Sequence, residues 1–375
     1  MSLKKSRRNK KDTVFLNGLY HPGMHPVFKS LMSFLPSKRV SSLRKSDSLS
    51  TSKNDTSKSS FNSVEASRVS GVSESRAPRA QSLDRDMEAV VPWNIAVSIV
   101  SRPGKVPMNP NKVNQDRVWV LHALANLPGL KFFGCADGHG VHGHDVAEMI
   151  MHELPIFLTQ NLLKTTQYNL ALTQAYSSMA LKLASSDVDS TFSGSTCVSV
   201  LLVSDQFGRK LICANVGDSR AVLGGLSRVG VLSNDHKPDL PIEKKRILAR
   251  RGRVSPYLSK SGEAMGPARV WLRNQELPGL AMSRSFGDSV AATVGVISEP
   301  EIIQIALEKD DKVLIIATDG VWEFISSDEA LAIIQPFIAS RDSKGAAELL
   351  CQISHQKWKS EEECIDDISC IIAFL

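Results

Sequence analysis

The sequence predicts an α+β fold in which antiparallel strands and helices form separate layers. Short apolar runs rich in Val, Ile and Leu cluster in the middle of the chain, and segments with helical periodicity lie before and after them. The regular alternation of strand and helix that would indicate a doubly wound parallel sheet is not present. The chain has 375 residues, of which 42% are hydrophobic, so it can bury a large core.

The strands are predicted from short apolar runs bounded by turn residues, and the helices from apolar residues recurring every three or four positions. The predicted strands are 95–100, 117–122, 131–136, 196–204, 210–215, 219–223, 313–318 and 368–374. The predicted helices are 143–163, 168–185, 241–251, 327–338 and 343–357.

The N-terminal part of the chain differs in composition from the rest. Residues 1–88 hold 17 Lys and Arg against 8 Asp and Glu, whereas the remaining residues hold 28 against 31. Between Pro36 and Ser82 there are 16 serines, and such a segment has too little apolar surface to offset the entropy cost of ordering. We therefore predict that residues 1–88 form a disordered basic Ser-rich tail. The body is not basic, so no nucleic-acid partner is expected.

The composition also bears on localisation. No stretch approaches 18 consecutive apolar residues, which argues against a transmembrane segment, and the N-terminus lacks the apolar region of a secretory signal. The six cysteines form no C-x-x-C pair, which favours free thiols in a reducing compartment over disulfides or a cysteine zinc site. We expect an intracellular monomer in the cytoplasm and/or the nucleus.

The most informative segment is 131–144, in which an apolar strand ends at an aspartate and a glycine-rich turn opens a helix. Gly138, Gly140 and Gly143 match the dinucleotide-binding pattern G-x-G-x-x-G. That interpretation also needs an acidic residue after a second strand about 20 residues later. Here residues 160–164 are predicted to be helical and contain no acid, so dinucleotide binding is disfavoured.

The same segment contains three histidines, which raises the possibility of a zinc site. His139, His142 and His144 have the spacing i, i+3, i+5, which does not place all three on one face of a helix, and no H-E-x-x-H motif is present. These histidines are therefore better explained as turn or cap residues, with the exception of His139, considered below.

A third interpretation is a site for a hard metal ion, because acidic residues recur at strand ends. Asp137 ends one predicted strand, Asp116 precedes another, Asp319 follows a third and Asp366 precedes the last. A single aspartate in such a place is usually a cap or turn residue. Four of them could converge at one edge of a β-core, where oxygen ligands suit Mg²⁺ or Mn²⁺. In this interpretation His139 beside Asp137 is a proton donor.

Eight motifs in the same order resemble the metal-dependent Ser/Thr protein phosphatases of type 2C over about residues 92–375. They are Asn114-Gln-Asp116, Asp137-Gly-His-Gly140, Ser193-Gly-Ser-Thr196, Ala214-Asn-Val-Gly-Asp218-Ser-Arg220, Asp235-His-Lys-Pro238, Gly279-Leu-Ala-Met-Ser-Arg-Ser-Phe-Gly-Asp288, Ala317-Thr-Asp-Gly-Val-Trp-Glu323 and Asp366-Asp-Ile-Ser369. The resemblance implies an α-β-β-α sandwich of two antiparallel sheets flanked by helices, with residues 92–375 as the catalytic domain. It also implies hydrolysis of phosphoserine and phosphothreonine in proteins by a metal-bound hydroxide at a binuclear Mg²⁺/Mn²⁺ site.

The resemblance assigns roles to individual positions. Asp137 is expected to bridge the two ions, and the Gly138 carbonyl to bind one of them. Asp319 and Asp366 are expected to bind the other, and Asp116 to hold metal-bound water. His139 corresponds to the general acid that protonates the departing Ser or Thr oxygen, which needs this help because an alkoxide is a poor leaving group.

The sequence departs from the family pattern at the phosphate-binding position. The family often places an arginine five residues before the aspartate that Asp116 matches, and here that residue is Asn111. We expect Lys112, or else Lys105 or Arg117, to bind the phosphate in place of this arginine. A lysine ammonium is a point charge and cannot form the two parallel hydrogen bonds that an arginine guanidinium makes with a phosphate.

The resemblance also bears on two further acidic residues and leaves alternative functions open. A third metal position would fall near Asp189, and Glu323 stands where many members have aspartate. The alternative is a pseudophosphatase scaffold that binds phosphoproteins without turnover, favoured by the missing arginine, and a smaller possibility is another metal-dependent phosphohydrolase. A kinase or ATPase is disfavoured because the chain has no G-x-x-x-x-G-K-[ST] loop.

Overall fold

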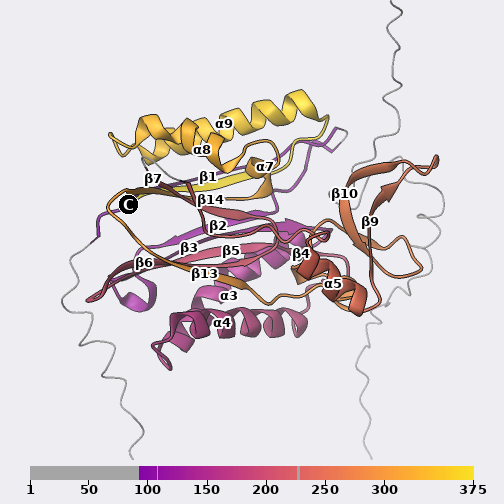
Figure 1. The fold of residues 1–375 in the computed structure, drawn as a ribbon, viewed down its shortest axis with the longest axis horizontal. Helices are drawn as coiled ribbons and strands as arrows, with labels where there is room; N and C mark the ends of the chain where they lie inside the picture. Colours follow the sequence, from indigo (N-terminus) through magenta and orange to yellow (C-terminus); the bar gives the residue numbers. More distant parts are fainter. Residues whose placement is uncertain (1–92, 108, 226–228) are drawn as a thin grey trace, which may run out of the picture. The chain divides into compact units, whose positions relative to one another are not determined.

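The computed structural model describes residues 93–107, 109–225 and 229–375, which fold around two antiparallel sheets (Figure 1). The first sheet has the spatial order β1 (Ala96–Arg102), β15 (Ile368–Phe374), β14 (Asp311–Ala317), β7 (Arg220–Gly225) and β8 (Val229–Val231). The second has the order β12 (Phe286–Gly287), β4 (Gly194–Ser195), β3 (Leu130–His139), β5 (Cys197–Asp205), β6 (Gly208–Val216) and β13 (Glu301–Ala306), and β2 (Asp116–Leu121) also pairs with β3.

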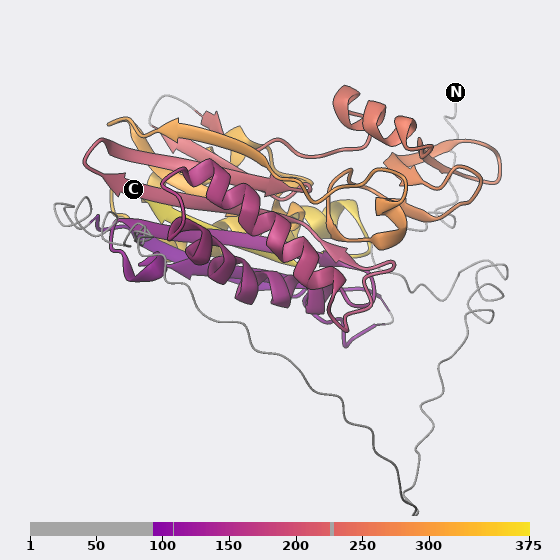
Figure 2. The same cartoon turned by 90° about the horizontal axis from the view of Figure 1, so that it is seen from below.

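Helices cover the outer face of each sheet, giving four layers (Figures 1 and 2). On the first sheet lie α8 (Ser327–Ile334), η2 (Gln335–Phe337) and α9 (Ser343–Glu361), with the short α7 (Asp319–Trp322) at the end of β14. On the second lie α3 (Gly143–Leu162) and α4 (Tyr168–Ala184), with the short η1 (Leu124–Asn126) between β2 and β3. The predicted α-β-β-α sandwich is confirmed.

Both sheets are buried on both faces, which explains why their central strands are continuous apolar runs. In β3, Phe132 packs towards α3 and α4, whereas its neighbour Phe133 packs between the sheets. In β15, Ile372 packs towards α9, and Ile371 packs between the sheets. Because side chains alternate along a strand, each central strand contributes to two of the three buried layers.

A third, smaller sheet lies beside the sandwich (Figure 1). It has the order β11 (Pro278–Leu280), β10 (Ala264–Trp271) and β9 (Arg253–Leu258), and it is preceded by α5 (Pro241–Ala249). The short helix α6 (Ser289–Ala292) follows β12. We refer to α5 and this three-stranded sheet, residues 241–280, as the flap.

All eight predicted strands and all five predicted helices are present, with ends shifted by a few residues. The flap strands, β13 and the short strands β4, β8 and β12 were not predicted. Strand β10 reads Ala-Met-Gly-Pro-Ala-Arg-Val-Trp, and a Gly-Pro pair is a turn signal, but here it lies within a half-exposed hairpin where pairing is irregular.

Three other expectations concern composition. The predicted tail, residues 1–88, lies outside the described residues. All six cysteines are free and five of them are buried, as expected for structural thiols. Within the part of the chain that the structure describes, no helix is long and apolar enough to cross a membrane.

Candidate active site

The four predicted acidic residues come together where the ends of strands from both sheets meet. Asp116 begins β2 and is the register partner of Asp137 near the end of β3. Asp319 is separated from the end of β14 by Thr318 and begins α7, and Asp366 lies just before β15. Thr318 joins the two sheets here, because its Oγ1 donates a hydrogen bond of 2.9 Å to Asp116 Oδ2. The sandwich therefore holds acids from distant parts of the chain at one end.

The glycines after Asp137 allow the chain to turn sharply from β3 into α3. A Cβ atom at Gly138 would lie 2.2 Å from the carbonyl oxygen of Gly143, so the strand and the start of the helix approach too closely for any side chain. Gly140 has a φ of +82°, in the left-handed region that glycine adopts without strain. The G-x-G-x-x-G spacing thus serves this turn.

The acidic cluster, defined as Asp116, Asp137, Asp319 and Asp366, is electrostatically strained. Burial raises the pKa of Asp137 well above its usual range, and the charges of the other three raise it further. Burial and the charge of Asp366 likewise raise the pKa of Asp319. Burial and the nearby Asp367 raise the pKa of Asp116 to about 7. Like charges at close range favour protonation, and a bound cation would relieve the repulsion.

Unpartnered oxygens in and beside the cluster indicate that these groups suit a metal ion. Asp116 Oδ1 and Asp319 Oδ1 are buried and have no hydrogen-bond partner among the described residues, and the same holds for Asp218 Oδ1 in the turn between β6 and β7. A buried carboxylate oxygen without a partner is costly. Oxygen donors of this kind are the ligands that Mg²⁺ and Mn²⁺ prefer.

The cluster does not form a complete protein cage. Among the residues that the structure describes, no group of three or more His, Cys, Asp or Glu side chains is arranged to hold a metal ion by itself. Mg²⁺ usually binds one or two carboxylates and keeps several water molecules, so a full protein cage is not needed. The residues present therefore fit hydrated divalent ions better than a closed structural site.

His139, at the end of β3, is held by an aspartate from a distant loop. Its Nε2 lies 2.7 Å from Asp288 Oδ2, which also accepts a hydrogen bond of 2.6 Å from Ser285 Oγ. Burial opposes protonation of the imidazole, but the Asp288 charge and hydrogen bond outweigh it and raise the pKa of His139. The other ring nitrogen, Nδ1, has no hydrogen-bond partner among the described residues. The arrangement favours a protonated imidazole whose Nδ1–H is buried and has no partner among the described residues.

Asp288 is a functional candidate that sequence reasoning missed. It ends the motif at 279–288, but its approach to His139 depends on the pairing of β12 with β4. The residue is 2% exposed, and its φ of +48° places it in the left-handed region, where aspartate is tolerated better than most residues. Sparsely populated backbone conformations in buried residues that make polar contacts are typical of functional sites.

Lys112, the predicted phosphate contact, is placed against acidic side chains. Its Nζ lies 2.5 Å from Asp367 Oδ1 and 3.6 Å from Asp366 Oδ1. Burial opposes its charge, but these two carboxylates raise the pKa of Lys112. Asp367 also accepts hydrogen bonds from the backbone N–H groups of Gly104 and Gln115, so it fixes two loops beside the cluster. Asn111, where the family often has arginine, is exposed.

Asp189, predicted near a third metal position, is not brought into the acidic cluster. It is exposed, and its carboxylate accepts a hydrogen bond of 3.0 Å from the backbone N–H of Thr191. Among the described residues, no interaction joins Asp189 to the four acids.

Other motifs of the series form contacts behind the acidic cluster. Thr196 Oγ1 accepts a hydrogen bond of 3.0 Å from the Asp137 N–H, and the Thr196 N–H donates one of 2.9 Å to the Asp137 carbonyl. Arg220 forms two hydrogen bonds to Asp235, of 2.9 and 2.6 Å, as an ion pair. Trp322 is 6% exposed and packs in the core between the first sheet and its helices. The two Thr196 hydrogen bonds therefore position Asp137, and the other contacts stabilise the surrounding fold.

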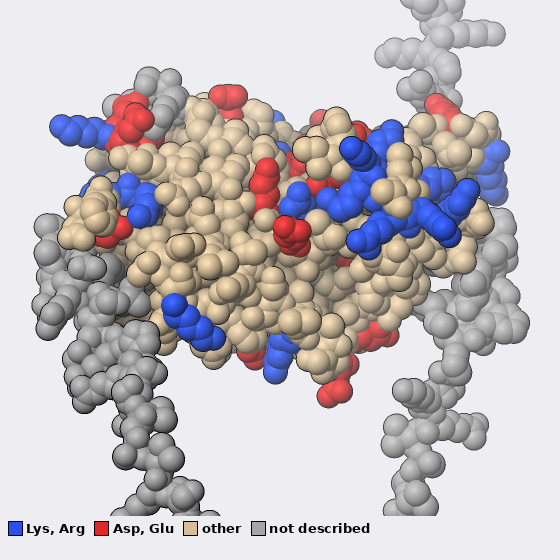
Figure 3. All heavy atoms as spheres, turned by 60° about the horizontal axis from the view of Figure 1, so that its bottom comes forward, with Lys and Arg blue, Asp and Glu red and all other residues tan. Residues whose placement is uncertain are grey.

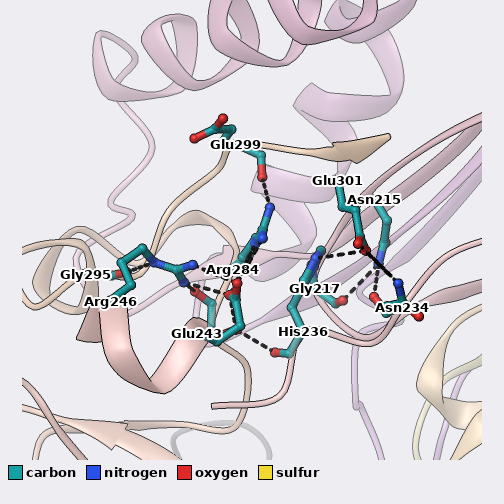
Figure 4. Close-up of polar contacts among 11 residues, drawn as sticks. Asn215, Gly217, Asn234, His236, Glu243, Arg246, Arg284, Gly295, Glu299 and Glu301 are labelled. Carbon is teal, nitrogen blue, oxygen red and sulfur yellow. Dashed lines mark hydrogen bonds and ion pairs between the residues drawn. The ribbon is translucent and has the colours of Figure 1, made fainter. Parts of the chain in front are cut away.

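A buried carboxylate fastens the flap to the sandwich (Figure 4). Glu243 in α5 accepts hydrogen bonds from Arg246 in the same helix and from Arg284 and Ser283 in the loop that leads to β12. Burial opposes ionisation of Glu243, but these hydrogen bonds outweigh it and lower its pKa to about 2. His236, just before α5, is kept neutral because burial and the Arg284 charge lower its pKa to about 4.

Replacing Glu243 by glutamine should therefore destabilise the protein by about 3 kcal/mol at pH 7, because two partly buried guanidinium groups lose their counter-charge. Since folding lowers the pKa of Glu243, its stabilisation is complete above about pH 4.5 and is lost as the pH falls towards 2. Urea unfolding of both proteins from pH 7 down to pH 3 measures the difference. Glu263→Gln, at an exposed position in the same flap, is the control and should change stability by less than about 0.5 kcal/mol. A difference that does not shrink in acid would contradict the assignment.

The fold described above occurs in a known protein structure. The fold is similar to a crystal structure of a serine-threonine phosphatase 2C from Toxoplasma gondii, with a TM-score of 0.62 and 20% sequence identity over 74% of this chain and 94% of that one. The arrangement of two sheets packed face to face between helices is thus shared with that protein.

Comparison of sequences then gives the family. The family model described as Protein phosphatase 2C matches residues 120–358. A probable protein phosphatase 2C 35 from Arabidopsis thaliana is 31% identical over 75% of this chain and 84% of its own length. A probable protein phosphatase 2C 64 from Oryza sativa subsp. japonica is 36% identical over 70% of this chain and 62% of its own length. The chain belongs to the protein phosphatase 2C family and is a protein Ser/Thr phosphatase.

Proposed function

We propose that this phosphatase hydrolyses phosphoserine and phosphothreonine in proteins with two Mg²⁺ or Mn²⁺ ions held at the acidic cluster. The observation that carries the proposal is the convergence of four aspartates from both sheets, with raised pKa values and unpartnered buried oxygens. Asp137 would lie between the two ions with the Gly138 carbonyl as a further ligand. Asp319 and Asp366 would bind one ion, and Asp116 would orient water.

The ions would supply the charge that neutralises the phosphate and lowers the pKa of an attacking water molecule. The protein supplies the position of the cluster and the proton for the leaving group. His139 would donate that proton from Nδ1, because Nε2 is occupied by Asp288. Asp288 keeps the ring oriented, and its negative charge favours the protonated imidazole.

A second candidate function is a scaffold that binds phosphoproteins without turnover. The observation that favours it is the state of the phosphate-binding position, where Asn111 replaces an arginine and Lys112 is paired with Asp366 and Asp367. Binding of metal at the cluster would compete with Lys112 for Asp366 and could free its ammonium group for the phosphate. Measuring phosphate release distinguishes the two functions, because only the phosphatase turns over its substrate.

Removing divalent metal should abolish phosphate release. We expect release from a phosphothreonine peptide to require Mn²⁺ or Mg²⁺, to stop in excess EDTA and to return when metal is added back, because the ions supply the charge at the reaction centre. Calorimetry with Mn²⁺ alone should show two binding events per chain. Mn²⁺ binding without release from any of several phosphopeptides would favour the scaffold, and release that persists in EDTA would contradict the metal site.

A further inference from the structure

Positive charge is concentrated in the flap of a body that is otherwise acidic. Residues 241–276 contain nine Lys and Arg against three Asp and Glu. The rest of residues 89–375 contains 19 against 28. Figure 3 shows the Lys and Arg side chains gathered over the side of the molecule where the flap lies. The flap therefore has a charge opposite to that of the remaining body.

Four of these cations form what we call the α5 surface: Lys244, Lys245, Arg250 and Arg251 on helix α5 and the turn after it. All four are exposed. None of them makes an ion pair with another described residue, whereas Arg246 and Arg253 are paired with Glu243 and Glu276. Cations near a helix C-terminus also stabilise the helix, because they interact favourably with its dipole. That role accounts for Arg250 and Arg251 but not for the two lysines in the first turns.

Exposed apolar side chains accompany the charges. Ile242 is 78% exposed, Leu248 is 51% exposed, and Leu240, just before the helix, is 40% exposed. Helix α5 docks on the protein through the buried Glu243 and Ile247 and through Arg246, which hydrogen-bonds to the carbonyls of Ser283 and Gly295. Its outer face therefore carries both cations and large apolar groups. Such a mixture suits a peptide that is acidic and carries apolar residues.

A short stretch of chain connects helix α5 to Lys237, which lies beside the acidic cluster. Lys237 pairs with Asp218 at 2.5 Å, and the charges of Asp218 and Asp319 raise the pKa of Lys237 despite its burial. Helix α5 begins four residues later, and four residues span at most about 14 Å. The first turn of α5 is therefore separated from the acidic cluster by only a short stretch of chain, and we expect residues that flank the phosphorylated residue of the substrate to extend towards it.

We propose that the α5 surface binds an acidic segment of the phosphoprotein substrate, adjacent to the phosphorylated residue, so that acidic phosphosites are preferred. The proposal rests on the proposed phosphatase function, because it defines the substrate class of that site. The chain's own N-terminal segment is unsuited to this surface, since residues 1–88 carry 17 Lys and Arg against 8 acids. Opposite charges across the interface would favour binding and accelerate encounter.

The first test measures binding without turnover. Fluorescence anisotropy in EDTA is recorded with a labelled acidic peptide that lacks phosphate, with a neutral peptide of equal length, and with a single-stranded DNA of equal charge. We expect the acidic peptide to bind best and to weaken as NaCl is raised, since the contacts are exposed. Replacing all four cations by glutamate should weaken binding about tenfold or more. Equal or tighter binding of the DNA would overturn the proposal in favour of a nucleic-acid surface.

The second test separates docking from chemistry. With phosphothreonine peptides, the four-glutamate variant should raise KM for the acidic peptide about tenfold while kcat stays unchanged, because the lost contacts are made equally in ground and transition states. The kinetics with the neutral peptide should stay close to wild type. A matched control reverses exposed lysines on other helices, Lys182→Glu and Lys344→Glu, and should change neither KM.

The outcomes distinguish failure of this inference from failure of the proposed function. If wild-type protein binds the acidic peptide preferentially but releases no phosphate with Mn²⁺, the docking surface stands and the phosphatase chemistry fails. If phosphate release is normal but the four-glutamate variant keeps the wild-type preference for acidic peptides, the docking surface is wrong. A variant with glutamine at the same four positions controls for a folding defect, and its melting temperature should equal that of wild type. Its KM for the acidic peptide should lie between those of wild type and the four-glutamate variant.

Discussion

Phosphate release should fall about a thousandfold or more when Asp137 is replaced by alanine, and Asp319→Ala should have a comparable effect. Both carboxylates lie in the acidic cluster, where each would hold a divalent ion at the reacting phosphate. Electrostatic groups at a reaction centre contribute two to three orders of magnitude each, and the loss of a bridging position would affect both ions. The measurement is phosphate release from a phosphothreonine peptide at saturating Mn²⁺.

Thermal unfolding gives a second readout that does not depend on activity. In EDTA, each alanine variant should be at least as stable as wild type, because removing one member of a set of crowded buried carboxylates relieves repulsion. Mn²⁺ should raise the melting temperature of wild type, since a ligand that binds only the folded state stabilises it, and this rise should be small in the variants. Asp187→Ala, at an exposed position, is the matched control and should behave as wild type.

A different pattern would contradict the assignment of the cluster. If Asp137→Ala unfolds at lower temperature in EDTA and loses activity only in proportion to the unfolded fraction, the carboxylate is structural. If activity and Mn²⁺ stabilisation both survive in Asp137→Ala and Asp319→Ala, the ions are held elsewhere.

The sandwich could be predicted from the sequence because its central strands are buried on both faces. Strands β5, β14 and β15 are buried at nearly every position, so each is a nearly continuous run of apolar side chains. The flap strands lack this constraint. Strand β9 carries a proline and two exposed residues at its end, and its pairing with β10 depends on tertiary context.

The acidic cluster was predictable for a similar reason, whereas its supporting residues were not. Asp137 and Asp319 lie at or just after the ends of apolar strands, and strands of one sandwich end close together. Asp288 and Asp367 act across large sequence separations: Asp288 on His139, 149 residues away, and Asp367 on Gln115, 252 residues away. Nothing in the local sequence shows which distant group a loop aspartate will meet.

Asp288→Asn should impair catalysis in a way that depends on the leaving group. Asparagine keeps the size of the side chain and an oxygen acceptor for His139 Nε2, but it removes the negative charge that favours a protonated imidazole. A phosphothreonine substrate leaves as an alkoxide and needs a proton, so kcat/KM should fall about a hundredfold. p-Nitrophenyl phosphate leaves as a stabilised phenolate without a proton, so its hydrolysis should fall by no more than about threefold.

The contrast between the two substrates separates a positioning role from a structural one. Asp288 is buried beside Gly194 and accepts a hydrogen bond from Ser285, so a collapse of this loop would distort the whole site and slow both substrates equally. His139→Gln should reproduce the leaving-group dependence of Asp288→Asn if both act through the same proton. Ser285→Ala, which removes one hydrogen bond to Asp288 but keeps its charge, should give the same pattern with a smaller loss. If Asp288→Asn lowers kcat/KM equally for both substrates, Asp288 is a structural residue. Protonation of His139 would then depend on another contact.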